Sequence, residues 1–172
     1  GGRKRSGVSR VLLGSTVQDV MLSAEQPVTI TGETSVTDDG TWRVLVPVDS
    51  DVERARHQAA YVTGLPGAAA AIEATVLTVF RHQDYRWAPP HTFEEIDAAV
   101  EAADAIEGAG VSVDRVAIGG EVARKILRVA ADRGVDSVAM GGRKRSGLQE
   151  VLMGSTTQDV MLSAERPVTI TG

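Results

Sequence analysis

Cysteine is absent from this sequence, and aromatic residues make up only 3% of its 172 positions. Without cysteine the chain can form neither disulfides nor thiolate metal sites. Its histidines, His57, His82 and His91, are too few and too scattered to predict a metal cluster, and we expect them on loops or facing solvent. With so few aromatic side chains, burial must come from many small aliphatic contacts, which suits helices packed on a sheet.

The sequence also lacks a basic excess and a long hydrophobic run. Its formal net charge is −5, whereas proteins that bind duplex nucleic acid usually need a positive face to displace counterions. Its longest apolar stretches fall far short of the roughly 20 residues that a membrane helix requires, and no signal peptide is visible. We therefore expect a soluble, cytoplasmic protein without a nucleic-acid or membrane partner.

An internal repeat is the most unusual feature. Residues 1–32 and 141–172 match at a constant offset of 140, and only six positions differ. A solenoid would need three or more repeats, and here 108 dissimilar residues separate two copies. We therefore interpret the repeat as a tandem pair of domains, with residues 1–32 as the end of the first. The alternative, a duplication introduced artificially, is disfavoured by the six substitutions.

Residues 33–41 are polar and aperiodic and predict a linker, which leaves residues 42–172 as the main domain. In that domain, runs rich in valine and isoleucine predict strands at 42–48, 74–80, 111–118, 136–140 and 167–171. Helical patterns between them predict helices ending near 63, 107, 132 and 165, the second opened by a capping box at Thr92–Glu95. This alternation predicts a doubly wound parallel sheet with helices on both faces. Ligands of such sheets bind beyond the carboxyl ends of the strands, which points to Asp49 and to residues 141–154.

The glycine-rich segment that follows the fourth strand has the chemistry of an anion site. Glycines such as Gly141 and Gly142 let the backbone approach a ligand, and a helix starting at Ser155 would offer free N–H groups to a phosphate. The basic run at 143–145 would add charge. A purely structural alternative remains open, in which the glycines turn the chain and Ser155 caps the helix. The pattern is neither a Walker A loop nor a GxGxxG fingerprint.

Four motifs together resemble the universal stress protein family. They are Val-Pro-Val-Asp at 46–49, Asp-Ser-Val-Ala-Met-Gly at 136–141, Gly-Ser at 154–155 and Pro-Val-Thr-Ile at 167–170. The resemblance covers residues 42–172. It implies a five-stranded parallel sheet in which the strands of the main domain, numbered along the chain, lie in the order 3-2-1-4-5. It also implies a homodimer formed through the last strand.

The resemblance implies ATP, with Mg²⁺, as the ligand, because ATP-binding members carry the motif G-x2-G-x9-G-S/T. It places Pro47, Val48, Asp49 and Val79 around the base and ribose, although an Asp between a strand and a helix is often only an N-cap. It places Gly141, Gly154, Ser155 and Thr156 on the phosphates, and the candidate set is completed by Met140, Arg143 and Lys144. Lys144 occupies the position of the motif's second glycine, so its side chain would either crowd the phosphates or hold them.

We expect a nucleotide-binding stress-response module that acts through assembly or signalling. The alternative is a dimerising scaffold that has lost ATP binding. No side chain near the glycine-rich segment stands out as a base for the attack of water, so the sequence predicts neither an enzyme nor catalytic residues. In the first copy, strand 27–31 is predicted to pair antiparallel with strand 167–171, as a partner subunit would. In the rival arrangement the first copy replaces residues 141–172 as a swapped element, or it docks on another chain.

Overall fold

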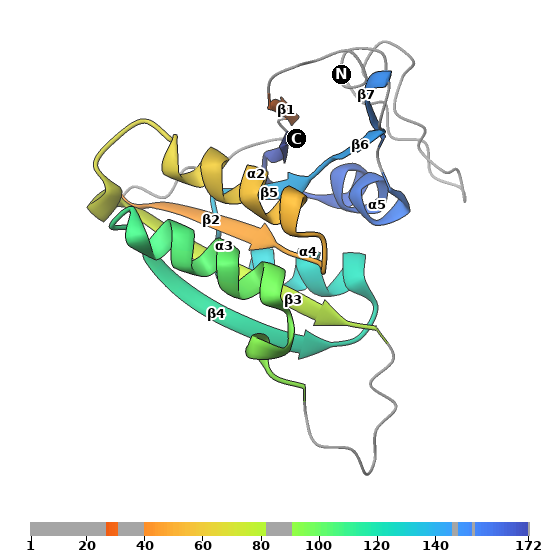
Figure 1. The fold of residues 1–172 in the computed structure, drawn as a ribbon, viewed down its shortest axis with the longest axis horizontal. Helices are drawn as coiled ribbons and strands as arrows, with labels where there is room; N and C mark the ends of the chain where they lie inside the picture. The colour runs from red at the N-terminus through yellow and green to blue at the C-terminus, as the bar shows by residue number, and fades with distance from the viewer. Residues whose placement is uncertain (1–26, 31–39, 82–90, 146–147, 153, 172) are drawn as a thin grey trace.

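A computed structural model describes residues 27–30, 40–81, 91–145, 148–152 and 154–171. A sheet with helices on both faces forms the domain (Figure 1). Its strands are β1 (Val28–Ile30), β2 (Trp42–Pro47), β3 (Ile72–Phe80), β4 (Ser112–Gly119), β5 (Ser137–Gly141) and β8 (Val168–Thr171). The helices are α2 (Val52–Thr63), α3 (Asp97–Gly108), α4 (Val122–Asp132) and α5 (Ser155–Ser163), with short 3₁₀ turns at Ala69–Ala71 and Phe93–Glu95.

The strands lie in the order β1-β8-β5-β2-β3-β4. β8, β5, β2, β3 and β4 run parallel to their neighbours in this group, whereas β1 pairs antiparallel with β8. The predicted α/β class with a mostly parallel sheet is therefore confirmed. The sheet has six strands and is mixed, because β1 adds an antiparallel strand to the five parallel strands of the main domain. The reason is that the repeated sequence forms a strand in both copies, and the first copy covers the edge of β8 that would otherwise expose unpaired backbone groups.

Each face of the sheet has its own aliphatic core, because alternate residues of a strand point to opposite faces. Val44 and Val46 of β2 pack in a cluster with α2 and α3, whereas Leu45 packs in a second cluster with α4 and α5. In Figure 1, α2 and α3 lie in front of the sheet and α4 lies behind it. The two clusters are lined mainly by Val, Ala, Leu and Ile, as the shortage of aromatic residues predicts.

Two predicted helix starts differ from the structure in detail. Asp51 caps α2, since its carboxylate accepts the backbone N–H of Arg54 at 3.1 Å. The capping box at Thr92 and Glu95 is formed, but it opens a 3₁₀ turn and not the α-helix itself. The helix α3 begins two residues later, because Ile96 adopts an extended conformation between the two elements.

We expected the glycine-rich segment to be a continuous loop, but the structure shows otherwise. Its backbone forms a second, two-stranded antiparallel sheet from β6 (Arg143–Arg145) and β7 (Leu148–Leu152). Lys144 lies in β6 opposite Val151, next to an irregularity in the pairing. The sequence Leu-Gln-Glu-Val-Leu at 148–152 does not alternate between apolar and polar residues, so it carries no period-two signal for this strand.

Strand β1 pairs with β8 in a register that relates equivalent positions of the two copies. Thr29 lies opposite Thr169, and the flanking pairs are Val28 with Ile170 and Ile30 with Val168. Because the offset between the copies is 140, Thr29 faces its own counterpart, Thr169. Val28 faces the counterpart of Ile30, and Ile30 faces the counterpart of Val28. The two threonine hydroxyls hydrogen-bond at 2.8 Å. The predicted antiparallel pairing of 27–31 with 167–171 thus holds for residues 28–30.

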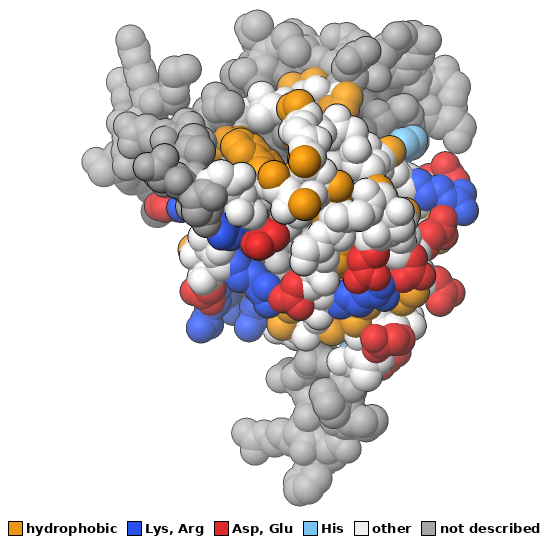
Figure 2. Space-filling view, turned by 90° about the vertical axis from the view of Figure 1, so that its left-hand side faces the viewer, with side chains coloured by type: hydrophobic (Ala, Val, Ile, Leu, Met, Phe, Trp, Pro, Cys, Tyr) orange, Lys and Arg blue, Asp and Glu red, His pale blue; other side chains and the backbone are white. Residues whose placement is uncertain are grey.

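The helix expected in the first copy, the linker 33–39 and the loop containing His82 lie outside the described residues. On the face shown in Figure 2, acidic and basic side chains are mixed without a block of one sign, and hydrophobic side chains gather towards the top. The described part of this face therefore offers no basic patch of the kind that nucleic acid requires. None of the described helices has the length and apolarity needed to cross a bilayer.

Candidate functional site

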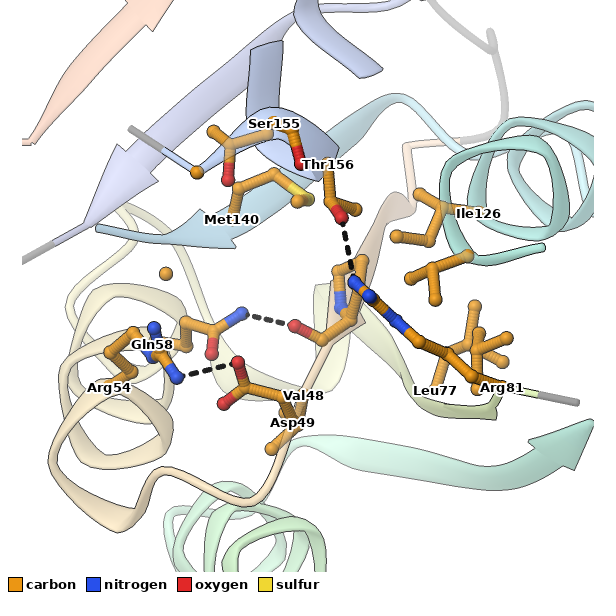
Figure 3. A pocket seen from close by; sticks show the side chains of 16 residues that line it. Val48, Asp49, Arg54, Gln58, Leu77, Arg81, Ile126, Met140, Ser155 and Thr156 are labelled. Carbon is orange, nitrogen blue, oxygen red and sulfur yellow. Dashed lines mark hydrogen bonds and ion pairs between the residues drawn. The ribbon is translucent and has the colours of Figure 1, made fainter. Parts of the chain in front are cut away.

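A cavity of about 340 Å³ opens at the carboxyl ends of β2, β3 and β5 (Figure 3). It lies at the switch in strand order, where β2 has the next strand of the chain, β3, as its neighbour on one side and the later strand β5 on the other. β2 and β5 share only the pairs Val44–Ser137 and Leu45–Val138, so their carboxyl ends diverge beyond Leu45. Ligands of doubly wound sheets bind in such crevices. The lining residues are Pro47, Val48, Asp49, Arg54, Gln58, Leu77, Val79, Arg81, Val122, Ile126, Met140, Gly141, Gly154, Ser155, Thr156 and Thr157.

Nine of the eleven residues predicted from the sequence line this cavity. They are Pro47, Val48, Asp49, Val79, Met140, Gly141, Gly154, Ser155 and Thr156. The side chains of the other two, Arg143 and Lys144, lie outside the description. The structure thus brings together residues that are more than 100 positions apart in the sequence.

Sequence reasoning missed the contributions of α2 and α4 and the residue after β3. Arg54 and Gln58 come from α2, Val122 and Ile126 from α4, and Arg81 directly follows β3. One signal for Gln58 was available, because it interrupts the otherwise apolar stripe of buried residues on α2. Arg81 could have been found as the first charged residue beyond a predicted strand, at the edge where ligands bind.

Gln58 ties the two diverging strands together at the base of the cavity. Its amide nitrogen donates to the carbonyl of Pro47 on β2 at 2.7 Å and to that of Ala139 on β5 at 2.8 Å. Two carbonyl acceptors need two N–H donors, which assigns the nitrogen to this end of the amide. The side chain is 2% exposed, and no described residue donates to its oxygen. Gln58 therefore presents a buried acceptor beside the cavity.

Asp49 is joined to Arg54 at one end of the cavity. The Arg54 guanidinium lies 2.6 Å from a carboxylate oxygen of Asp49 and 3.4 Å from one of Asp51. Asp49 also accepts the backbone N–H of Asp51 at 3.0 Å. The alternative that Asp49 serves only as the N-cap of α2 is therefore wrong, because Asp51 has that role. The carboxylate of Asp49 remains 58% exposed, so its free lone pairs face the solvent side of the cavity.

Gly141 is required by close packing against α2. A β-carbon at this position would lie 3.1 Å from Cβ of Arg54 and 3.2 Å from Oε1 of Gln58, closer than ordinary van der Waals contact. The backbone cannot easily withdraw, because Gly141 is paired with Thr171 of β8 and the N–H of Gly142 donates to the Thr171 carbonyl at 2.6 Å. A β-carbon on Gly154, in contrast, would meet nothing within 4 Å.

The amino terminus of α5 borders the cavity opposite Asp49. Gly154 is its N-cap, and no side chain caps the helix, so the alternative that Ser155 only caps it is wrong. The first N–H groups of such a helix and the positive end of its dipole attract anions. The guanidinium of Arg81 donates to the hydroxyl of Thr156 in the first turn, at 3.3 Å. Figure 3 shows this contact joining the β3 side of the cavity to α5.

The remaining wall is apolar. It is formed by side chains from β2, β3, α4 and β5, namely Val48, Leu77, Val79, Ile126 and Met140. A surface of this kind suits the flat, weakly hydrated face of an aromatic ring, while the groups at the two ends can hydrogen-bond. No group of three histidine or acidic side chains that could hold a metal occurs in the described parts of the chain.

A model of the universal stress protein family matches residues 41–172. The chain belongs to the universal stress protein family. A universal stress protein of Bacillus subtilis, YxiE, is 30% identical over 142 residues, which cover 77% of this chain and 93% of that protein. Universal stress protein MJ0577 of Methanocaldococcus jannaschii is 32% identical over 65 residues, or 38% of this chain and 40% of that protein.

Solved structures of universal stress proteins share the fold. One from Archaeoglobus fulgidus superposes with a TM-score of 0.60 at 24% identity, covering 92% of this chain and 54% of that chain. A universal stress protein in complex with cAMP has a TM-score of 0.55 at 19% identity, covering 76% and 95% of the two chains. A universal stress protein from Archaeoglobus fulgidus in complex with dAMP has a TM-score of 0.53 at 20% identity, covering 76% of this chain and 98% of that chain.

Proposed function

We propose that this universal stress protein binds an adenine nucleotide, with ATP as the expected ligand, in the cavity at the ends of β2, β3 and β5. The observation that carries the proposal is the position of the cavity at the reversal of strand order, beside the uncapped amino terminus of α5. An apolar wall at one side suits a base, and N–H groups at the other suit a phosphate. Nucleotide binding would then act either by producing a stress-response signal or by changing how the protein assembles.

Two further observations support this ligand class. Nine residues predicted for a nucleotide site line one cavity, although they come from four separate segments of the sequence. Structural neighbours were solved with cAMP and with dAMP, and both ligands carry an adenine and a phosphate. Mg²⁺ would reach the site on the phosphates of ATP, with the hydroxyls of Ser155 and Thr156 close by, since the described residues hold no metal cluster of their own.

Titration calorimetry with ATP, ADP and AMP tests the proposal directly. We expect saturable binding to the wild type below millimolar concentration. Gly154→Val should weaken it at least tenfold, because the branched side chain would enter the lining of the cavity at the start of α5. The absence of any saturable signal at millimolar nucleotide would refute the proposal and favour the scaffold that has lost ATP binding.

The variant Lys144→Gly tests the role of Lys144, which occupies the position of the motif's second glycine. If Lys144 crowds the phosphates, the variant should bind ATP more tightly than the wild type. If its ammonium holds them, the variant should bind ATP more weakly while binding of adenosine stays unchanged. Adenosine serves as the control because it has no phosphate.

We place this protein among binding modules and not among enzymes. Among the described residues that line the cavity, the only carboxylate is that of Asp49, and none is a histidine or a cysteine. A general base must lie within hydrogen-bond reach of the attacking water, whereas Asp49 lies opposite the amino terminus of α5, where we propose that the phosphates bind. Multiple turnovers of ATP by the pure protein with Mg²⁺ would overturn this assignment.

A second part of the proposal concerns assembly, and the register of β1 on β8 favours it. Identical Pro-Val-Thr-Ile segments pair about Thr29 and Thr169, so the contact has the symmetry of two copies of β8 meeting across a two-fold axis. Such a contact is self-complementary. We therefore propose that the edge of β8 is the assembly surface and that β1 of the same chain covers it.

Engineered disulfides test this arrangement cleanly, because the chain has no cysteine of its own. Facing residues of antiparallel strands lie about 4.5–5.5 Å apart at Cα, within the range of a disulfide. Thr29→Cys/Thr169→Cys should oxidise to a cross-linked monomer. Thr169→Cys should form disulfide dimers only when Thr29→Pro disrupts β1, and the exposed control Thr63→Cys should not respond to that change. Dimers of the double-cysteine protein would refute the intrachain arrangement.

A further inference from the structure

The balance of charge in the cavity identifies which part of it takes an anion. Its lining contains three ionised side chains, Asp49, Arg54 and Arg81. Arg54 is compensated twice, by Asp49 at 2.6 Å and by Asp51 at 3.4 Å. Arg81 has no carboxylate partner among the described residues, and its one hydrogen bond goes to the neutral hydroxyl of Thr156. The positive charge left over in the cavity therefore lies at the Arg81 end.

The position of Arg81 adds to this charge the donors of α5. The contact with Thr156 holds the guanidinium beside the first turn of α5, whose N–H groups no side chain caps. A guanidinium has five N–H donors, and one contact to a hydroxyl leaves most of them free for a ligand. Fixed N–H groups and a guanidinium at one end form a receptor for a phosphate, which binds charged donors through strong, short hydrogen bonds.

The other polar end of the cavity has the opposite character. There the amide of Gln58 is fixed by two carbonyls and leaves its oxygen as an acceptor, and Asp49 also presents acceptors. Acceptors repel phosphate oxygens but bind the hydroxyl and amino groups of a nucleoside. Gln58 and Asp49 thus place acceptors near α2, beside the paired guanidinium of Arg54, whereas the donors without a carboxylate partner lie near Arg81 and the start of α5.

We infer that Arg81 is the phosphate-binding cation of this protein and that it selects phosphorylated nucleosides over nucleosides, an inference that rests on the proposed nucleotide site. The residue directly follows β3 and does not belong to the glycine-rich segment, where the sequence had suggested Arg143 and Lys144. On binding, the guanidinium exchanges the Thr156 hydroxyl for phosphate oxygens, which are stronger acceptors because they are charged.

The experiment compares adenosine, AMP and ATP on the wild type, on Arg81→Gln and on Arg81→Lys by titration calorimetry. Arg81→Gln should weaken AMP and ATP about tenfold or more, the effect of one charged hydrogen bond, and leave adenosine within about twofold. Arg81→Lys should recover part of the loss, because it keeps the charge and loses the planar fork. Arg124→Gln on α4 is the matched control, since it removes an exposed arginine that does not line the cavity.

Each outcome separates this inference from the proposed function. If the wild type binds ATP but Arg81→Gln binds ATP equally well, or loses adenosine and ATP in equal proportion, the inference is refuted and nucleotide binding stands. If the wild type binds no adenine compound, the proposed function fails. Inorganic pyrophosphate then tests the inference alone: binding by the wild type that is lost in Arg81→Gln supports an anion site, and no binding by the wild type refutes it.

Discussion

Serine substitutions at Gly141 and Gly154 should have very different effects on stability, although both glycines line the cavity. At Gly141 the new β-carbon would meet Cβ of Arg54 at 3.1 Å and Oε1 of Gln58 at 3.2 Å. Comfortable separations between carbon atoms are about 3.5–4.0 Å, so the first contact is too short by roughly 0.4–0.9 Å. At Gly154 the β-carbon would lie in open space.

The surroundings of Gly141 cannot relax cheaply. Cβ of Arg54 moves only with the backbone of α2, and the Gln58 amide is held by two hydrogen bonds at 2.7 and 2.8 Å. Overpacking of this kind costs about 1–3 kcal/mol. For a domain of this size that lowers the melting temperature by about 2–12 °C, taking about 2–4 °C per kcal/mol. Gly154→Ser should stay within about 0.5 kcal/mol of the wild type, because serine is at least as good an N-cap as glycine.

Guanidinium chloride unfolding followed by circular dichroism measures both changes as shifts of the transition midpoint. The slope of the transition should be the same in all three proteins, since none of the changes alters the surface exposed on unfolding. A Gly141→Ser protein as stable as the wild type would refute the reasoning, because it would mean that α2 yields without cost. A strongly destabilised Gly154→Ser protein would refute it as well.

Three further predictions concern the fold around the site. Gln58→Leu has a similar volume but removes both donors to the strand ends, and it should cost about 1–3 kcal/mol in a chemical denaturation experiment. Ile106→Ala, in the fully buried face of α3, should cost about 2–5 kcal/mol in the same assay, and a loss below 1 kcal/mol would contradict the packing of that face. Glu95 accepts the N–H of Thr92, which lowers the pKa of its carboxyl below 4.5, and a hydrogen bond from His91 lowers it further. Because this pKa is lowered on folding, the charge stabilises the protein above about pH 4.5 and its contribution is lost as the pH falls through the folded value. Thermal melts of Glu95→Gln and wild type should therefore converge at low pH and differ at pH 7, and a constant difference across this range would contradict the assignment.

The class of fold was predictable because its signal is local. Each strand of the main domain is a short valine-rich run, and each helix between them repeats at helical spacing, so the alternation of elements follows from the residues themselves. The extra strand β1 was predicted as well, because the repeat gives it the same sequence as β8, although its partner lies 140 positions away. The pairing of β6 with β7 was missed, because neither segment alternates between apolar and polar residues.

The site was predictable only in part, for a physical reason. Residues at the ends of strands and at the start of α5 could be placed because parallel strands bring their carboxyl ends to one edge. Arg54 and Gln58 depend on how α2 packs across β2 and β5, a tertiary arrangement that a helical pattern alone does not specify. The place of Arg81 after a strand was open to prediction, but its contact with Thr156 of α5 was not, because no spacing in the sequence reveals that contact.

The short contact between β2 and β5 divides the sheet into two mechanical halves. Only two residue pairs join β2 to β5, whereas β3 and β4 pair along eight positions. The amide of Gln58 adds a bridge between the carboxyl ends of these strands, while hydrogen bonds of Arg43 with Asp136 and of Trp42 with Ser137 join their other ends, and the cavity lies over the same junction. A molecule bound there touches both halves at once and so adds a connection where the sheet has fewest. A bound ligand should therefore resist sliding of the two halves past each other. It should also slow the hydrogen exchange of backbone amides on either side of the junction. In this way a small ligand can change the stiffness of the whole domain without changing its shape.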